Sequence, residues 1–150
     1  MLEIWNDFLS NRPLIAALCG WFVAQVLKAV IYAIVNRKFE AERLVGDGGF
    51  PSCHSAMVTA LATSCYITYG IASPYFTISA VFALIVMHDA MGVRLETGRQ
   101  AKIINDIIEF FDKAGSDLTD EEKLKELVGH TPIQVIAGSI LGLLVAVFLR

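Results

Sequence analysis

The chain has 150 residues, of which 55% are hydrophobic and 18% charged, with a formal net charge of −3 and a mean hydropathy of +0.58. This composition is too apolar for an ordinary soluble domain and is typical of a small membrane protein. Nothing in the net charge points to nucleic acid, and we expect no nucleic-acid partner. The chain is predicted to form a single integral membrane domain over residues 1–150.

Four apolar blocks follow one another along the chain, at residues 13–35, 55–71, 75–91 and 132–149. A bilayer core needs about 17–25 helical residues, so the first block spans comfortably and the other three lie near the lower limit. We therefore expect an all-α polytopic bundle with about four transmembrane helices. The alternative for one of the shorter blocks is a helix buried in a soluble core.

The start of the chain does not resemble a signal peptide. Glu3 and Asp7 precede the first apolar block where a signal peptide would carry basic residues, so we expect this block to be retained. The cysteines, Cys19, Cys53 and Cys65, have no paired or ligand-like spacing. Neither a disulfide framework nor a zinc site is expected.

The basic residues predict the orientation of a four-span bundle. The connections 36–54 and 92–131 fall on one side, and Arg12 and Arg150 on the other. The two connections carry Arg37, Lys38, Arg43, Arg94, Arg99, Lys102, Lys113, Lys123 and Lys125. Because Lys and Arg are enriched in cytoplasmic loops, we expect both connections to be cytoplasmic, or stromal or matrix-facing in an organelle.

Two histidines stand at the starts of apolar helices on that same side. His54 lies in the run Phe-Pro-Ser-Cys-His-Ser, where Ser52 can cap the following helix, and His130 directly precedes Thr131-Pro132, a cap followed by a first-turn proline. A helix start offers unpaired N–H groups and a partial positive charge, which favours phosphate chemistry. The pair His88-Asp89 ends the third block on the same side.

The long connection 92–131 has two predicted helices of its own. Apolar residues recur at helical spacing opposite charged ones; they are Ile103, Ile104, Ile107, Ile108, Phe110 and Phe111. This pattern predicts an amphipathic helix in the headgroup region, with packing against the bundle or a partner subunit as the alternative. The run 119–122 matches a capping box and predicts a short helix to Val128.

Three motifs together resemble a known family. They are Gly-Gly-Phe-Pro-Ser-Cys-His-Ser-Ala at 48–56, His-Asp-Ala-Met-Gly-Val-Arg at 88–94 and Leu-Lys-Glu-Leu-Val-Gly-His-Thr-Pro at 124–132. In this order they resemble the divergent branch of the type 2 phosphatidic acid phosphatase superfamily, described as acid phosphatase/vanadium-dependent haloperoxidase-related. The resemblance covers about residues 10–150.

The resemblance implies a phosphomonoesterase in which His130 attacks phosphorus and His54 protonates the leaving oxygen. A neutral imidazole is a competent nucleophile, and a second imidazole suits proton transfer near neutral pH. Cations and backbone N–H groups would neutralise the phosphoryl oxygens. Candidate substrate-binding residues are Lys38, Arg43, Ser52, Arg94 and Lys125, with Arg37 as a further cation.

The chain departs from the superfamily pattern at several positions. The aspartate that orients the nucleophilic histidine falls on Gln134, which accepts a hydrogen bond but carries no charge. Asp89 is our candidate for the missing catalytic carboxylate, because a carboxylate in a span is costly unless paired. The position of the superfamily's Ser-Arg pair corresponds to Leu124 in this chain, which is flanked by Lys123 and Lys125. The superfamily's first motif, a lysine followed by Arg-Pro, has no match here.

We therefore expect a membrane phosphatase acting on a lipid phosphate monoester such as a phosphatidylglycerophosphate-like lipid, through a phosphohistidine. An isoprenyl diphosphate is the alternative substrate. Two other classes stay open: a non-catalytic protein that binds lipid headgroups or a partner, and a transporter-like bundle with Gln25, Lys28 and Asp89 along a polar path. No cofactor is expected, although a divalent cation is possible. Gly138 and Gly142 permit close helix packing, within the subunit or across a homodimer, and we favour the homodimer.

Overall fold

The computed structural model describes residues 1–37, 49–113 and 129–150, and in these ranges every regular element is a helix. The helices are α1 (Leu2–Ser10), α2 (Arg12–Asn36), α3 (Cys53–Tyr69), α4 (Pro74–Met91), α5 (Val93–Lys113) and α6 (Pro132–Phe148). The predicted all-α class is confirmed. The short helix predicted over 119–128 lies outside the described residues.

Side-chain caps set the starts of the apolar helices within one or two residues of the predicted blocks. The side chains of Asn11, Ser52, Ser73 and Thr131 accept hydrogen bonds from backbone N–H groups in the first turns of α2, α3, α4 and α6. Each such bond satisfies an N–H group that has no partner within its own helix. The predicted caps at Ser52 and Thr131 are confirmed.

Small residues let α6 and α2 approach α3 closely. A Cβ atom built on Gly138 would lie 2.3 Å from the backbone oxygen of Ser52, and one on Gly142 would lie 2.2 Å from that of Ala56. From the first contact to the second, the residue number rises by four on both helices, so α6 runs parallel to α3. On the other side of α3, a Cβ on Gly20 would lie 2.9 Å from the Cβ of Ala60. The close packing predicted for Gly138 and Gly142 thus occurs within the subunit.

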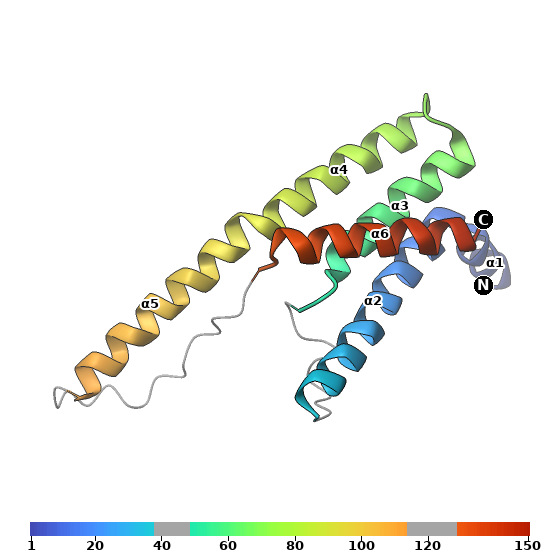
Figure 1. Ribbon diagram of the computed structural model, residues 1–150. Coiled ribbons are helices and arrows are strands. Elements are labelled where there is room, and N and C mark those ends of the chain that lie inside the picture. Colours follow the sequence, from blue (N-terminus) through green and yellow to red (C-terminus); the bar gives the residue numbers. More distant parts are fainter. Residues whose placement is uncertain (38–48, 114–128) are drawn as a thin grey trace.

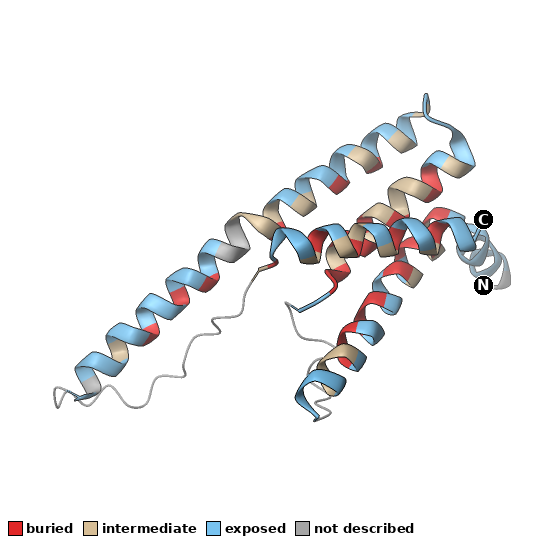
Figure 2. Cartoon of the chain, viewed as in Figure 1, coloured by how far each residue is buried: buried red, intermediate tan, exposed pale blue. Residues whose placement is uncertain are grey.

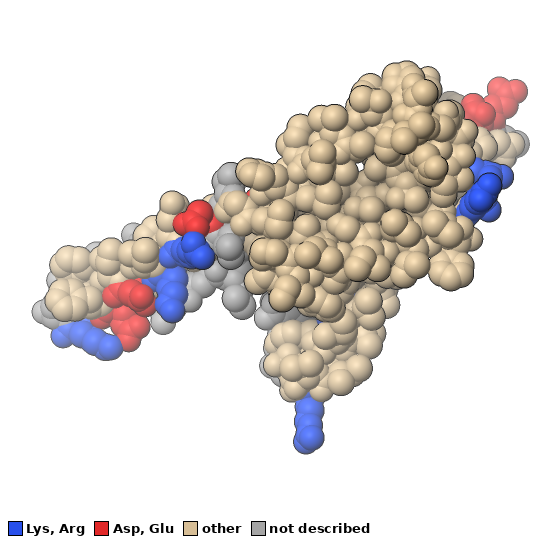
Figure 3. Space-filling model, turned by 45° about the horizontal axis from the view of Figure 1, so that its top comes forward, with Lys and Arg blue, Asp and Glu red and all other residues tan. Residues whose placement is uncertain are grey.

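The surface of the bundle is apolar between its ends. Buried residues lie mainly where α2, α3 and α6 face one another, while α4 has few of them, namely Ser79, Ala83 and Ala90 (Figure 2). On the face shown in Figure 3, Lys, Arg, Asp and Glu gather along α5 and at the extremities of the molecule, and the body between them carries none. This distribution suits helices surrounded by hydrocarbon.

Two helical runs in the described residues have the length and hydropathy for a membrane crossing. They are Arg12–Asn36 and Pro74–Phe111, the second running through α4 and most of α5, while Pro132–Phe148 is a shorter apolar helix. A count of about four spans therefore stays a prediction.

The end of α2, the start of α3, the end of α4 and the start of α6 gather on one side of the bundle, away from the N and C termini (Figure 1). Two backbone hydrogen bonds tie three of these ends together. The N–H of Ser52 donates to the carbonyl of Gln134, and the N–H of His130 donates to the carbonyl of Ala90, each at 3.0 Å. The predicted gathering of the two histidine motifs on one side is thereby observed.

Helix α5 follows α4 after Gly92 and extends beyond the bundle (Figure 1). Its predicted apolar positions Ile103, Ile104, Ile107, Phe110 and Phe111 are exposed. Ion pairs join Glu96 to Arg99 and Glu109 to Lys113 on the same helix. The amphipathic pattern is thus present as a helix, and its location in the headgroup region stays a prediction.

Candidate functional site

The structure brings His54 and His130 together. Their ring centroids lie 5.9 Å apart with the planes at 60°. His54 is in the first turn of α3 and His130 precedes α6 by two residues. Because α6 runs parallel to α3 and the N–H of Ser52 donates to the carbonyl of Gln134 in the first turn of α6, the starts of the two helices lie close together, and the two imidazoles meet there.

His130 is held from its backbone and from its ring. It is 2% exposed, and its N–H donates to the carbonyl of Ala90 at the end of α4. Its Nδ1 lies 3.3 Å from Oε1 of Gln134. The side chain predicted to replace the superfamily's aspartate therefore does reach back to the imidazole.

The amide of Gln134 has only one suitable orientation at this site. Its Oε1 accepts a hydrogen bond from the N–H of Thr131 at 3.0 Å, and an amide nitrogen could not accept there. The same oxygen faces Nδ1 of His130, so this contact is a hydrogen bond when Nδ1 carries the proton. In that tautomer the lone pair lies on Nε2.

Ser52 lies at the start of α3, and its predicted contact with substrate stays a prediction. Its side chain is completely buried, and its Oγ accepts hydrogen bonds from the N–H and the Oγ of Ser55 at 3.3 and 3.0 Å. Its N–H donates to Gln134, as described above. Ser52 thus caps α3 and joins it to α6, and so positions both histidines.

Asp89, the predicted carboxylate, is half-buried near the end of α4. It lies one residue before Ala90, whose carbonyl holds His130, and it lines a groove between α4 and α6 together with His88. The remaining predicted cations are placed only in part. Arg94 is in the first turn of α5, and Lys38, Arg43 and Lys125 lie outside the described residues.

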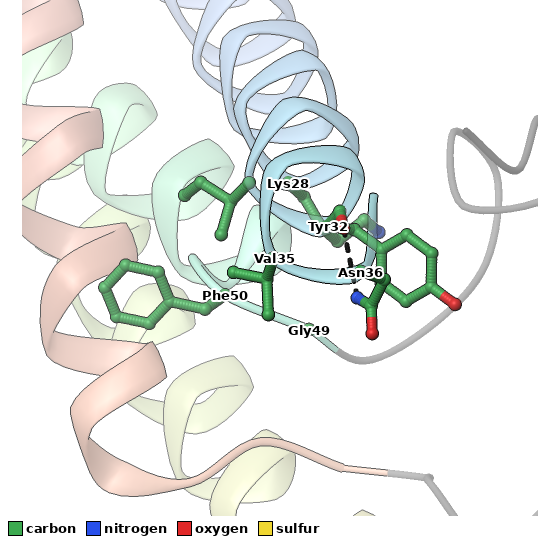
Figure 4. Close-up of a pocket in the computed structure, with 7 residues that line it drawn as sticks. Lys28, Tyr32, Val35, Asn36, Gly49 and Phe50 are labelled. Atoms are coloured by element: carbon green, nitrogen blue, oxygen red, sulfur yellow. Dashed lines mark hydrogen bonds between the residues drawn. The ribbon is translucent and has the colours of Figure 1, made fainter. Parts of the chain in front are cut away.

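A second polar feature lies at the end of α2. Lys28 is 4% exposed, and its Cδ lies 2.9 Å from the position that a Cβ on Gly49 would take. Figure 4 shows the cavity of about 170 Å³ that it lines with Tyr32, Asn36 and Phe50. In the sequence, this feature is visible as a lysine inside the apolar block 13–35. Ionisable residues in membrane-spanning segments are rare and usually functional.

Metal-ligand clusters are absent from the parts of the chain that the structure describes: no three His, Cys, Asp or Glu side chains gather there.

The apolar helices and their apolar surface define the protein as a helical membrane protein, with a histidine pair at the starts of two of its helices. The chain belongs to the Divergent PAP2 family, whose sequence pattern matches residues 9–145. It is also 40% identical over 152 aligned residues to "Uncharacterized membrane protein YuiD" of Bacillus subtilis (strain 168), an alignment covering 95% of this chain and 96% of the relative. No solved structure matches the chain.

Proposed function

We propose that the protein is a membrane phosphatase that hydrolyses a lipid phosphate monoester, with a phosphatidylglycerophosphate-like lipid as the preferred substrate. The observation that supports this most directly is the 5.9 Å separation of the His54 and His130 rings at two adjacent helix starts. A nucleophile attacks from about 3–3.5 Å, and a general acid acts from about 2.6–3.2 Å. Two imidazoles this close can serve the same phosphoryl group.

In the proposed reaction, Nε2 of His130 attacks phosphorus and the bond from phosphorus to the lipid oxygen breaks. His54 in its protonated form gives its proton to that oxygen, and the lipid alcohol leaves. Water, deprotonated by His54, then attacks the phosphohistidine and releases phosphate, which restores both imidazoles. The starts of α3 and α6 supply a partial positive charge for the phosphoryl oxygens.

Gln134 sets the tautomer in this scheme without supplying charge. An amide oxygen on Nδ1 directs the attacking lone pair to Nε2, whereas a carboxylate would also stabilise the imidazolium. We therefore expect slow turnover unless a carboxylate such as Asp89 contributes to the same site.

The test is phosphate release from lipid phosphates by purified protein, with and without a divalent cation. His130→Ala should abolish release, and His54→Ala should reduce it most for substrates with poor leaving groups. The control is Phe22→Ala, which removes an exposed aromatic side chain of α2 outside both the histidine pair and the α4–α6 groove. Near-normal release by His130→Ala would contradict the proposed nucleophile.

The uncharged Gln134 favours one other function, the binding of a lipid phosphate headgroup without turnover. In that case wild-type protein would bind phosphate-bearing vesicles, and His130→Ala would weaken that binding while no phosphate is released by either form.

A further inference from the structure

We propose that the groove between α4 and α6 holds the hydrocarbon chain of the lipid phosphate, which enters sideways from the bilayer. Hydrolysis of this lipid rests on the proposed function, whereas binding of its chain does not. The substrate class is then a phosphate ester of a long-chain lipid whose tail extends along α4 and α6 while its phosphate reaches the histidine pair.

The groove has the size and surface of a lipid-chain site. Its volume is about 900 Å³, within the range of about 300–1,000 Å³ usual for small-molecule sites. Leu84 and Ile85 line it from α4, and Ile136 and Ile140 from α6. All four side chains are exposed. An apolar surface open to the side of a bundle is available to lipid tails directly.

The polar side chain of Ser139 also lines the groove, but its hydroxyl proton is already hydrogen-bonded within the protein. The hydroxyl of Ser139 donates to the carbonyl of Val135 at 2.9 Å and lies 3.1 Å from the sulfur of Met87. Its O–H donor is satisfied within the protein, so a hydrocarbon chain can cover it without leaving a donor unsatisfied.

One end of the groove adjoins the histidine site. Asp89 lines the groove, and the next residue, Ala90, accepts the backbone hydrogen bond of His130. A chain lying in the groove therefore brings its polar end to the start of α6. This continuity distinguishes the α4–α6 groove from the cavity at Lys28, which is lined by α2 and the residues before α3.

A second copy of the bundle fits this groove less well than a flexible chain. Transmembrane helices pack through small residues that allow their backbones to approach. The groove is lined mainly by Leu, Ile and Met side chains, and its one small residue, Ser139, uses its hydroxyl proton within the subunit. The glycines of α6, Gly138 and Gly142, already contact α3. Large apolar side chains around an open groove suit a flexible hydrocarbon chain, which can adapt its shape to them.

The test compares hexadecyl phosphate with butyl phosphate as substrates for wild type, the groove-filling variant Leu84→Trp/Ile140→Trp, and the control Val30→Trp. Val30 is an exposed apolar residue of α2 outside the groove. Because excluding about two methylene groups from an apolar site costs about tenfold in affinity, we expect kcat/KM for hexadecyl phosphate to fall at least about tenfold in the groove variant. Butyl phosphate hydrolysis and the control should be unchanged.

A second measurement separates the groove from the phosphatase. A hexadecyl phosphate carrying a photoactivatable group near its chain end should crosslink to α4 and α6, and the groove-filling variant should lose this crosslink. If no phosphate is released from either substrate but this pattern holds, the phosphatase fails and the chain site stands. The proposed chain site is wrong if the groove variant and wild type hydrolyse hexadecyl phosphate equally well. It is also wrong if the photoactivatable lipid labels α2 as strongly as α4 and α6. Crosslinking of two subunits through Ile136→Cys in membranes, unaffected by added hexadecyl phosphate, would show that a second subunit occupies the groove instead.

Discussion

Replacing Gly142 by alanine should push α6 away from α3 and separate the two histidines. The new Cβ would lie 2.2 Å from the backbone oxygen of Ala56, and ordinary contact begins at 3.4 Å, so about 1.2 Å of movement is required. The obstacle is backbone within a helix, which cannot rotate aside. Overpacking of this kind costs about 1–3 kcal/mol of stability. A misplacement of about 1 Å lowers a catalytic rate by about 10²-fold.

Thermal unfolding in detergent and phosphate release would measure both effects. The matched control is Gly20→Ala on α2, whose Cβ would meet the Cβ of Ala60 at 2.9 Å and the oxygen of Ala56 at 3.0 Å. This overlap is smaller and does not involve the helix that follows His130. Gly142→Ala should therefore have the lower unfolding temperature and the greater loss of activity. Equal behaviour of the two variants, or wild-type behaviour of Gly142→Ala, would refute the role of close α3–α6 packing in aligning the site.

Two further predictions concern the charge at the site and its side of the membrane. Gln134→Glu should raise the rate or move the pH optimum upward, because a carboxylate beside His130 stabilises the protonated imidazole and attack requires the neutral form; an unchanged pH–rate profile in an active enzyme would place the orienting carboxylate elsewhere. In a background without the native cysteines, Asp47→Cys and Ser116→Cys should both react with an impermeant thiol reagent from the cytoplasmic face and Glu3→Cys from the outside. Labelling of the first two from opposite sides would break the four-span arrangement.

Local sequence determined the helices of this protein and their starts. The apolar blocks predicted at 13–35, 55–71, 75–91 and 132–149 match α2, α3, α4 and α6 within two residues at each end. Such agreement is expected because apolar runs and capping side chains act within a few residues of each other. The helix α1 was not predicted, since its nine residues lack a long apolar run.

Which helices touch was decided only by the tertiary structure. The spacing of Gly138 and Gly142 predicts close packing, but the partner was open between the same subunit and a second one, and the structure assigns α3. The homodimer stays a prediction, and because Gly138 and Gly142 contact α3 of the same subunit, they no longer support it. Likewise, the residues around Ser52 predict its role as a cap but not that its N–H donates to Gln134 of another helix.

The candidate site shows the same division. The motifs around His54 and His130 single out both histidines, yet nothing local determines that their rings lie 5.9 Å apart. That distance follows from the parallel pairing of α3 and α6, which depends on backbone contacts between residues more than eighty positions apart. The groove beside Asp89 also exists only because α6 packs on α3 and leaves α4 partly uncovered. Residue types and caps are local properties, whereas the meeting of side chains is set by helix packing.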